Sequence, residues 1–159
     1  MSANCTITRF YNIVCDIIIF MKLVLDTDVI VAAMRSPSGA SAEILRRVRA
    51  QQWRMGCSVS LFMEYEAICS RSAHLHAAGW SAQNLDVFMN ALAAMIEPVQ
   101  IHYLWRPQLR DPADEMVLEA AVNSGASALI TFNKKHFFIA STLFNLAVLS
   151  PSELLRNTP

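Results

Sequence analysis

The chain lacks an excess of charge of either sign, and this limits how it can bind a polyanion. Its 13 Lys and Arg residues balance 13 Asp and Glu residues, so the formal net charge is zero. A strongly basic chain would indicate nucleic-acid binding directly. Here any contact with nucleic acid has to come from local patches of charge or from a bound cation.

Cysteine, glycine and proline are also scarce. The four cysteines are Cys5, Cys15, Cys57 and Cys69; none forms a CxxC pair, which argues against a zinc site and favours buried thiols in a reducing cytosol. Only four glycines and six prolines occur, which argues against a loop-rich fold. P-loop, GxGxxG and GxSxG motifs are missing, so the sequence offers neither a nucleotide-binding loop nor a nucleophilic serine elbow.

The apolar runs are too short or too interrupted to cross a bilayer. The most apolar stretch, residues 13–25, contains Asp16 and Lys22. It is followed by no small-residue cleavage site of the kind that marks a signal peptide. We therefore expect a cytoplasmic protein that makes no membrane contact.

What is present is an apolar chain sized for one domain. It has 159 residues and a hydrophobic content of 54%, enough for a substantial core. A second Met-Lys pair, Met21-Lys22, directly precedes a clear strand. We therefore divide the chain into an extension outside the core, residues 1–20, and a single domain, residues 21–159. The extension is either an upstream translation artefact or an added edge strand over residues 11–20, and both interpretations stay open.

From Met21 onwards, short apolar strands alternate with amphipathic helices. The expected strands are residues 22–26, 54–59, 99–103, 126–131 and 146–149. The expected helices are residues 29–34, 40–52, 60–70, 81–95, 111–124, 134–140 and 151–156. This alternation is typical of βαβ units and predicts an α/β fold with a mostly parallel sheet covered by helices on both faces.

Polar residues follow two of the predicted strands. Asp26 closes the first strand, and Thr131 and Asn133 follow a later one. In open parallel sheets, sites form beyond the carboxyl ends of the strands. A carboxylate at the end of a buried strand is poorly solvated and needs a cation or several hydrogen-bond donors. Asp28 is interpreted as the cap of the following helix, so Asp26 is the stronger site candidate.

Glu64 lies on the helix expected over residues 60–70. Leu61 and Ile68 are three and four residues away, so Glu64 borders the apolar stripe, while Glu66 points roughly the opposite way. Taken alone, a solvated helix glutamate is the simpler interpretation of Glu64.

The helix expected over residues 111–124 begins with several acids. Asp111 stands before a proline and is interpreted as the N-cap. Asp114 falls on the apolar stripe at the helix start, although an acid there also supports the helix dipole. Glu115 aligns with Glu119 on another face and is expected to be solvated.

Acids from three distant segments would repel one another if they met. A divalent cation removes that repulsion, and hard oxygen ligands with retained water suit Mg²⁺ or Mn²⁺. The hypothesis is therefore that Asp26, Glu64 and Asp114 form a metal site able to promote displacement at phosphorus.

The four histidines are weaker candidates. His74 and His76 have the spacing of a metal pair but fall in an expected loop with no partner nearby, and His102 and His136 are isolated. We expect none of the four to act in the site.

Together these segments resemble the motifs of PIN domains, in order and in spacing. Met21-Lys-Leu-Val-Leu-Asp-Thr-Asp-Val-Ile30 resembles the opening strand and first acid, Ser58 followed by Glu64 the second motif, and residues 110–121 the third-acid helix. Thr131-Phe-Asn133 resembles the closing motif. Leu149-Ser-Pro-Ser-Glu-Leu-Leu155 resembles the tail of VapC-like bacterial PIN proteins, the toxins of type II toxin–antitoxin systems.

The resemblance implies a three-layer α/β/α sandwich and an endoribonuclease that depends on Mg²⁺ or Mn²⁺. It implies a toxin that forms a homodimer and pairs with an antitoxin. Its catalytic and metal-binding residues would be Asp26, Glu64 and Asp114. Relatives often carry a fourth acid where this chain has Asn133, which offers a carbonyl oxygen but no charge. The site would then hold one ion more firmly than a second, or hold both weakly.

Further residues are assigned by their position near these acids. The supporting residues are Asp28, Asp111, Glu115, Thr131 and Asn133. RNA needs cationic contacts to its phosphates, and the candidate RNA-binding residues are Arg35, Arg106, Arg110, Lys134 and Lys135. The apolar side of the helix over residues 81–95, with Leu85, Phe88, Met89 and Leu92, is a candidate surface for a partner.

Two alternatives stay open. In the first, Asn133 marks a catalytically weakened PIN module that acts by binding protein or RNA. In the second, Leu23-Val-Leu-Asp-Thr-Asp-Val29 is the nucleophile motif of a HAD-type phosphatase. That chemistry needs a late acidic pair, and Glu153 is the sole acid after Thr131, so we place it well below the PIN interpretation.

Overall fold

The computed structural model describes residues 21–104, 106–109 and 111–158. The expected extension, residues 1–20, lies outside the described residues, as do Trp105 and Arg110. Within the described ranges, none of the helices is both long enough and apolar enough to span a membrane.

A parallel sheet of five strands forms the centre of the molecule, in the order β3-β2-β1-β4-β5. The strands are β1 (Lys22–Leu25), β2 (Arg54–Cys57), β3 (Ile96–Pro98), β4 (Ala128–Ile130) and β5 (Ala147–Leu149). In the middle strand β1, Leu23 lies opposite Met55 of β2 and Val24 lies opposite Leu129 of β4. All four of these side chains are fully buried, as expected of strands covered on both faces.

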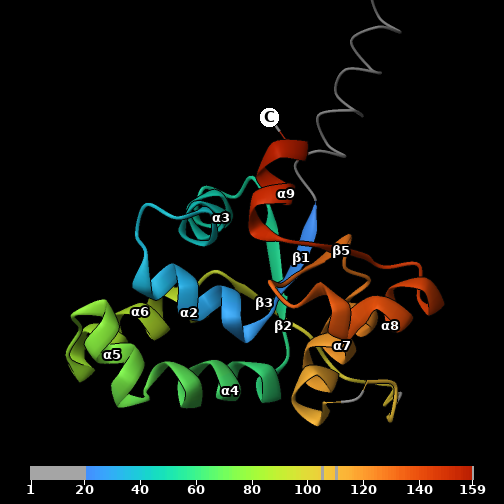
Figure 1. Cartoon of the computed structure of the whole chain (residues 1–159), viewed down its shortest axis with the longest axis horizontal. Coiled ribbons are helices and arrows are strands. Elements are labelled where there is room, and N and C mark those ends of the chain that lie inside the picture. Colours follow the sequence, from blue (N-terminus) through green and yellow to red (C-terminus); the bar gives the residue numbers. More distant parts are fainter. Residues whose placement is uncertain (1–20, 105, 110, 159) are drawn as a thin grey trace, which may run out of the picture.

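Helices cover both faces of this sheet, with α2 to α6 on one side and α7 and α8 on the other (Figure 1). They are α2 (Thr27–Arg35), α3 (Ala40–Arg49), α4 (Val59–Cys69), α5 (Ser72–Ala78), α6 (Ala82–Ala93), α7 (Pro112–Ser124), the 3₁₀ helix η1 (Lys134–Phe137), α8 (Phe138–Leu143) and α9 (Pro151–Asn157). Helix α7 packs across β1, β2 and β4. The predicted α/β/α sandwich with a parallel sheet is confirmed.

The strand order reverses at β1. The chain first builds outward from β1 through β2 to β3, and then returns to the other side of β1 to add β4 and β5. Ligand sites of open parallel sheets lie beyond the carboxyl ends of the strands at such a reversal. Asp26 directly follows β1 and Thr131 directly follows β4, so the fold brings both residues to this place.

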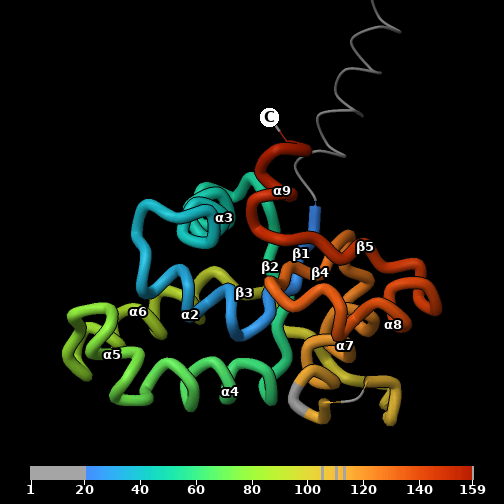
Figure 2. Tube along the Cα trace, viewed as in Figure 1, coloured from blue at the N-terminus to red at the C-terminus, as the bar shows by residue number. Residues whose placement is uncertain are grey.

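The strand predicted over residues 99–103 is wrong in position, because β3 comes earlier and is shorter. A side chain uses the backbone donors that a longer strand would need: Oδ1 of Asn123 accepts hydrogen bonds from the N–H groups of His102 and Tyr103, both at 3.0 Å. Figure 2 shows the chain leaving β3 and running along the lower edge of the molecule before it enters α7.

The loop predicted around His74 and His76 is also wrong, because both residues lie on α5. Gly79 ends this helix in the left-handed conformation, with a φ of 67°, which glycine adopts without strain. Alanine and histidine fill most of the seven-residue helix, so its sequence has no strong apolar period that would have predicted it.

The partner surface predicted on α6 is wrong as well. Leu85, Met89 and Leu92 are 6%, 7% and 0% exposed, because this apolar side packs into the core of the molecule. Phe88 packs edge-on against Trp80, with ring centroids 5.2 Å apart. The apolar residues of α6 therefore mark the side of the helix that packs against the core.

Candidate active site

Asp26 joins the ends of the two central strands. Its Oδ1 accepts a hydrogen bond from the N–H of Thr27 at 2.7 Å, which makes Asp26 the N-cap of α2. Its Oδ2 accepts a hydrogen bond from the hydroxyl of Thr131 at 2.6 Å. The residue is 6% exposed, and this burial raises the pKa of the carboxyl although both hydrogen bonds favour the ionised form.

Asp28 lies in the first turn of α2, so the prediction that it caps this helix is wrong. Its Oδ2 accepts hydrogen bonds from the N–H of Phe132 at 3.2 Å and from the side-chain amide of Asn133 at 3.1 Å. Its Oδ1 is buried and has no hydrogen-bond partner among the described residues. Burial, and then the neighbouring Asp26, raise the pKa of Asp28 to about 7.

Glu64 is placed by α4, which begins at the cap residue Ser58; the hydroxyl of Ser58 accepts the N–H of Leu61 at 3.3 Å. The next residue, Tyr65, is fully buried and donates its hydroxyl proton to the carbonyl of Leu25, which ties α4 to the end of β1. Glu64 itself is half-buried. Burial raises its pKa, and the charge of Asp26 raises it further.

Asp114 lies in the first turn of α7 with 15% of its side chain exposed. Its Oδ2 lies 2.8 Å from Nδ1 of His136, a hydrogen-bond distance. Burial raises the pKa of Asp114, and the contact with His136 lowers it. The expectation that His136 is isolated is therefore wrong. No spacing in the sequence links the two residues, because the contact depends on how η1 packs beside α7.

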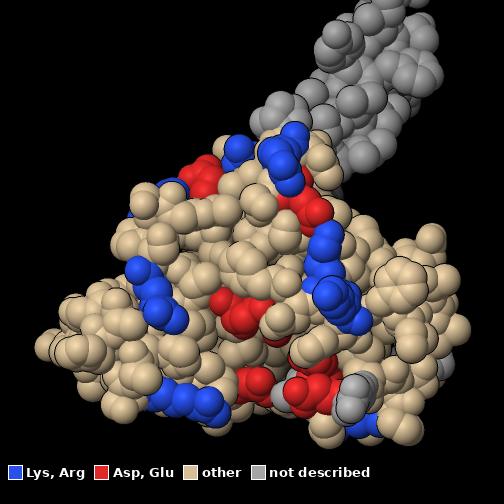
Figure 3. Space-filling model, viewed as in Figure 1, with Lys and Arg blue, Asp and Glu red and all other residues tan. Residues whose placement is uncertain are grey.

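These acids line one hollow of about 760 Å³ beyond the carboxyl ends of β1 and β4. Its acidic lining residues are Asp26, Asp28, Glu64, Asp111 and Asp114, and Arg35, His74, Asn133 and His136 also line it. Figure 3 shows carboxylate side chains gathered in the recessed middle of this face, with Lys and Arg side chains on the surrounding surface. The fold thus brings together the three acids that the sequence singled out, although they come from three separate segments.

The oxygen atoms that line this acidic hollow suit a cation that keeps part of its water shell better than a cation enclosed entirely by protein ligands. Within the described residues, no three His, Cys, Asp or Glu side chains lie close enough together to enclose an ion. The hollow nevertheless presents carboxylate oxygens whose burial disfavours their charge, and Asp28 Oδ1 lacks a donor. Mg²⁺ typically keeps several waters and uses one or two carboxylates. Such an ion suits this set of oxygens.

Thr131 and Asn133 hold the acids in place. The N–H of Asn133 donates to the hydroxyl oxygen of Thr131 at 2.9 Å, and that hydroxyl donates to Asp26. The Asn133 amide nitrogen donates to Asp28. Both residues thus orient carboxylates at the start of α2, and Asn133 presents a donor to the hollow where a fourth acid would present an acceptor.

Glu115 and Glu119 do not belong to the acidic hollow. Each is 2% exposed, so the prediction that Glu115 is solvated is wrong. Glu115 Oε1 accepts hydrogen bonds from the N–H groups of Gln108 and Leu109, at 2.6 and 2.8 Å. Glu119 accepts two hydrogen bonds from Arg106, at 2.8 and 2.9 Å. Both glutamates therefore fix the segment that precedes α7.

The candidate RNA-binding cations differ in how far they are already occupied. Arg106 is bound to Glu119, and the Lys134 ammonium lies 2.7 Å from Oε1 of Glu153. Lys135 is exposed and has no ion-pair partner among the described residues. Arg35 lines the acidic hollow, and Arg110 lies outside the described residues. Their role in RNA binding stays a prediction.

Comparison with known proteins identifies the family. Residues 22–135 match the family model of the PIN domain. The chain therefore belongs to the PIN-domain family, whose members are generally nucleases and typically use divalent metals. The PIN-domain family therefore takes the place of the HAD-type phosphatase as the class of this protein.

One solved structure with the same fold is that of VapBC2 from Rickettsia felis bound to a DNA fragment from their promoter. Its similarity to this chain has a TM-score of 0.59 at 15% sequence identity, and it covers 82% of this chain and 98% of the other. At that identity the similarity shows the fold alone. A comparison with curated proteins finds no match.

Proposed function

We propose that this protein is an endoribonuclease that depends on Mg²⁺ or Mn²⁺, with Asp26, Glu64 and Asp114 as its catalytic and metal-binding residues. One observation carries the proposal: carboxylates from three distant segments line a single hollow, where burial and mutual repulsion raise their pKa values. A fold does not gather charges at such a cost without a compensating group. Family membership supports nuclease chemistry as the purpose of the hollow.

Each residue has a distinct part in this proposal. Glu64 and Asp114 supply negative oxygens from the helix side of the hollow, and Asp26 supplies one from the strand side. Thr131 holds Asp26 in one orientation through its 2.6 Å hydrogen bond, and His136 holds Asp114. The divalent ion, when bound, supplies positive charge that stabilises the charge developing on the phosphate oxygens.

Glu64→Gln is the sharpest test, because Glu64 is half-buried and has no part in capping a helix. We expect purified Glu64→Gln to lose at least about 100-fold in the rate of cleavage of a structured RNA with Mn²⁺. Asp26→Asn should lose activity too, but Asp26 also caps α2, so its folding has to be checked.

Glu66→Gln is the matched control, because Glu66 is exposed on the same helix and does not line the acidic hollow. It should cleave RNA as the unsubstituted protein does. Equal activity of Glu64→Gln and the unsubstituted protein would exclude this mechanism.

A weakened PIN module remains the second candidate function, since Asn133 presents a donor and no charge to Asp28. The same assay separates the two candidates. Binding of RNA without cleavage at any Mn²⁺ concentration would favour the weakened module.

We also propose that the protein is the toxin of a toxin–antitoxin pair and forms a homodimer. VapBC2, with which it shares its fold, supports this reading. Expression from an inducible promoter should arrest bacterial growth, and Glu64→Gln should relieve the arrest. A molar mass by light scattering that stays that of one chain at every concentration would exclude the dimer.

A further inference from the structure

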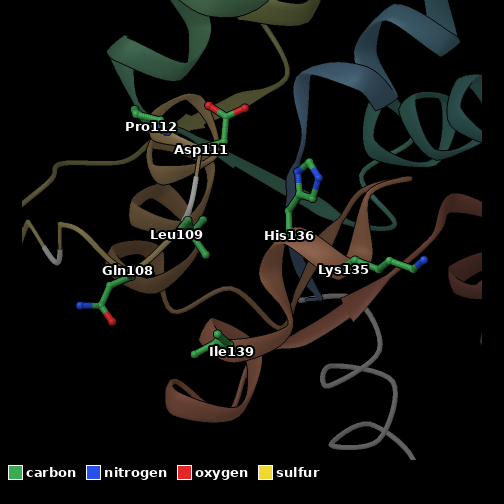
Figure 4. Close-up of a pocket in the computed structure, with 7 residues that line it drawn as sticks. All are labelled: Gln108, Leu109, Asp111, Pro112, Lys135, His136 and Ile139. Carbon is green, nitrogen blue, oxygen red and sulfur yellow. The ribbon is translucent and has the colours of Figure 1, made fainter.

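A second cavity, of about 630 Å³, lies beside the acidic hollow. The segment before α7 forms one wall, and η1 with α8 forms the other. Its lining residues are Gln108, Leu109, Asp111, Pro112, Lys135, His136 and Ile139 (Figure 4). None of the chemistry proposed above uses this cavity.

The cavity and the acidic hollow are neighbours. Asp111 and His136 line both of them. His136 also contacts Asp114 through Nδ1, so its ring stands between the carboxylates and the second cavity. If a ligand placed its phosphate in the acidic hollow, the group attached beside that phosphate would therefore reach the second cavity.

The walls of the cavity combine apolar side chains, those of Leu109, Pro112 and Ile139, with polar ones. In Figure 4 Leu109 lies on one side of the cavity and His136 on the other, with Ile139 below them. The side chains of Gln108 and Lys135 lie on opposite sides, with their polar ends directed outward. Ile139 is 73% exposed, so α8 leaves apolar surface open at the edge of this space.

The cavity is held open by contacts within the protein. On one wall, the buried carboxylate of Glu115 binds the N–H groups of Gln108 and Leu109. On the other wall, His136 is held by Asp114 at 2.8 Å. Because these walls are already fixed, less binding free energy is lost to ordering the protein when a ligand enters.

We propose that this cavity, the base subsite, holds one unpaired nucleobase of the RNA, next to the phosphate that occupies the acidic hollow. This rests on the proposed function and narrows its substrate to RNA that is single-stranded beside the cut. The volume falls within the range of roughly 300–1,000 Å³ of small-ligand sites. The apolar side chains of Leu109, Pro112 and Ile139 suit the faces of a flat ring, and Lys135, which has no ion-pair partner among the described residues, suits a flanking phosphate.

Paired RNA could not use the base subsite, because a base inside a helix keeps its faces stacked and its edge paired. A protein segment is the other conceivable occupant. Continuity with the acidic hollow favours RNA, since the scissile phosphate and the next base are joined by one sugar.

Abasic scanning tests the base subsite independently of catalysis. The probe is a 5′-fluorescein single-stranded octauridylate, together with eight derivatives that each carry one abasic nucleotide. Binding is measured by fluorescence anisotropy in Mg²⁺ to the Glu64→Gln protein, which should not cut the probe. We expect one abasic position to weaken binding about ten-fold, since a stacked base contributes that much affinity.

Ile139→Ser in the same Glu64→Gln background should reduce that abasic penalty to less than about two-fold. Leu143→Ser is the matched control, because Leu143 lies one turn further along α8, is 63% exposed and does not line the base subsite. It should leave the penalty unchanged. Both side chains are exposed, so neither change should unfold the protein.

An equal abasic penalty in all three proteins, or no penalty at any position, would overturn the base subsite. That result would be compatible with RNA cleavage by the unsubstituted protein, so the proposed function would survive it. If Ile139→Ser removes the penalty but the unsubstituted protein cuts no RNA, the base subsite would remain as a binding site and the nuclease proposal would be removed.

Discussion

Asp114 and Glu115 are neighbours in the first turn of α7, yet their carboxylates meet opposite surroundings. Glu115 is the more deeply buried, and two backbone N–H groups of the protein bind one of its oxygens. Asp114 faces the acidic hollow, where burial raises its pKa and Nδ1 of His136 lies 2.8 Å from its Oδ2. Burial of an acid is therefore a poor guide to a site, and whether its carboxylate lines the hollow is a better one.

The same contrast extends along the chain. Glu119 resembles Glu115, because Arg106 satisfies both of its oxygens. Asp28 resembles Asp114, because both carboxylates line the acidic hollow and burial raises the pKa of both. One group of acids holds the fold together, and the other is the group that we propose binds a cation.

The largest expected effect separates the two neighbours by substitution. Asp114→Asn should slow RNA cleavage at least about 100-fold while leaving the free energy of unfolding unchanged or higher, because it removes a repelled charge. Glu115→Ala should lower the free energy of unfolding by about 1–3 kcal/mol, because two backbone donors lose their acceptor. Cleavage assays and urea unfolding of each variant give both quantities.

The folded fraction of Glu115→Ala should lose less of its cleavage rate than Asp114→Asn, because Glu115 does not line the acidic hollow and acts only through the wall of the base subsite. A loss of cleavage as large as that of Asp114→Asn, at full folding, would break the comparison. It would place Glu115 in the catalytic machinery.

A smaller expected effect is the pH dependence of stability that Asp28 causes. The folded protein raises the pKa of this acid from 3.8 to about 7, so the folded state binds the proton more tightly than the unfolded state. The stability that Asp28 contributes is complete below about pH 4 and is lost as the pH rises through about 7. Without divalent ions, Asp28→Asn should therefore become the more stable protein, relative to the unsubstituted one, as the pH rises from about 5 to about 8.

Unfolding of both proteins in urea at several pH values, with and without Mg²⁺, measures this effect. Mg²⁺ should reduce the difference at the upper end of the range, because a bound cation favours the ionised carboxylate. A stability difference that does not change with pH would show that Asp28 is ionised without cost. It would then contradict the raised pKa on which this prediction rests.

Much of the fold was predictable because its signals are local. Short apolar runs gave the strands, as in Leu23 to Leu25, and the serine before α4 marked the start of that helix. That the three acids meet in one hollow was also predictable, since they follow strands or border apolar stripes, whereas their catalytic role stays a prediction. The failures at α5 and at residues 99–103 have different causes. The apolar period of α5 is weak. At residues 99–103 a distant side chain, Asn123, takes the backbone donors.

The partners of the acids could not be predicted, because each comes from elsewhere in the chain. His136 reaches Asp114 across 22 positions, and Asn133 reaches Asp28 across 105. The burial of Glu115 depends on a segment that folds back onto α7. Spacing along a helix cannot reveal which face a loop will cover, so it predicted solvent for a residue that is 2% exposed.

The smallest expected effect applies the comparison to cations. Lys134 and Lys135 are neighbours, but both oxygens of Glu153 bind Lys134, at 2.7 and 2.9 Å, whereas Lys135 stands at the rim of the base subsite. Lys135→Ala should weaken RNA binding about three- to ten-fold at low salt. It should also reduce the slope of log K for RNA binding against log salt concentration by about one. Lys134→Ala should weaken binding less, because the positive charge that it removes is already balanced by Glu153. Anisotropy titrations in the Glu64→Gln background at several salt concentrations measure both, and equal losses would mean that the ion pair with Glu153 opens to bind RNA.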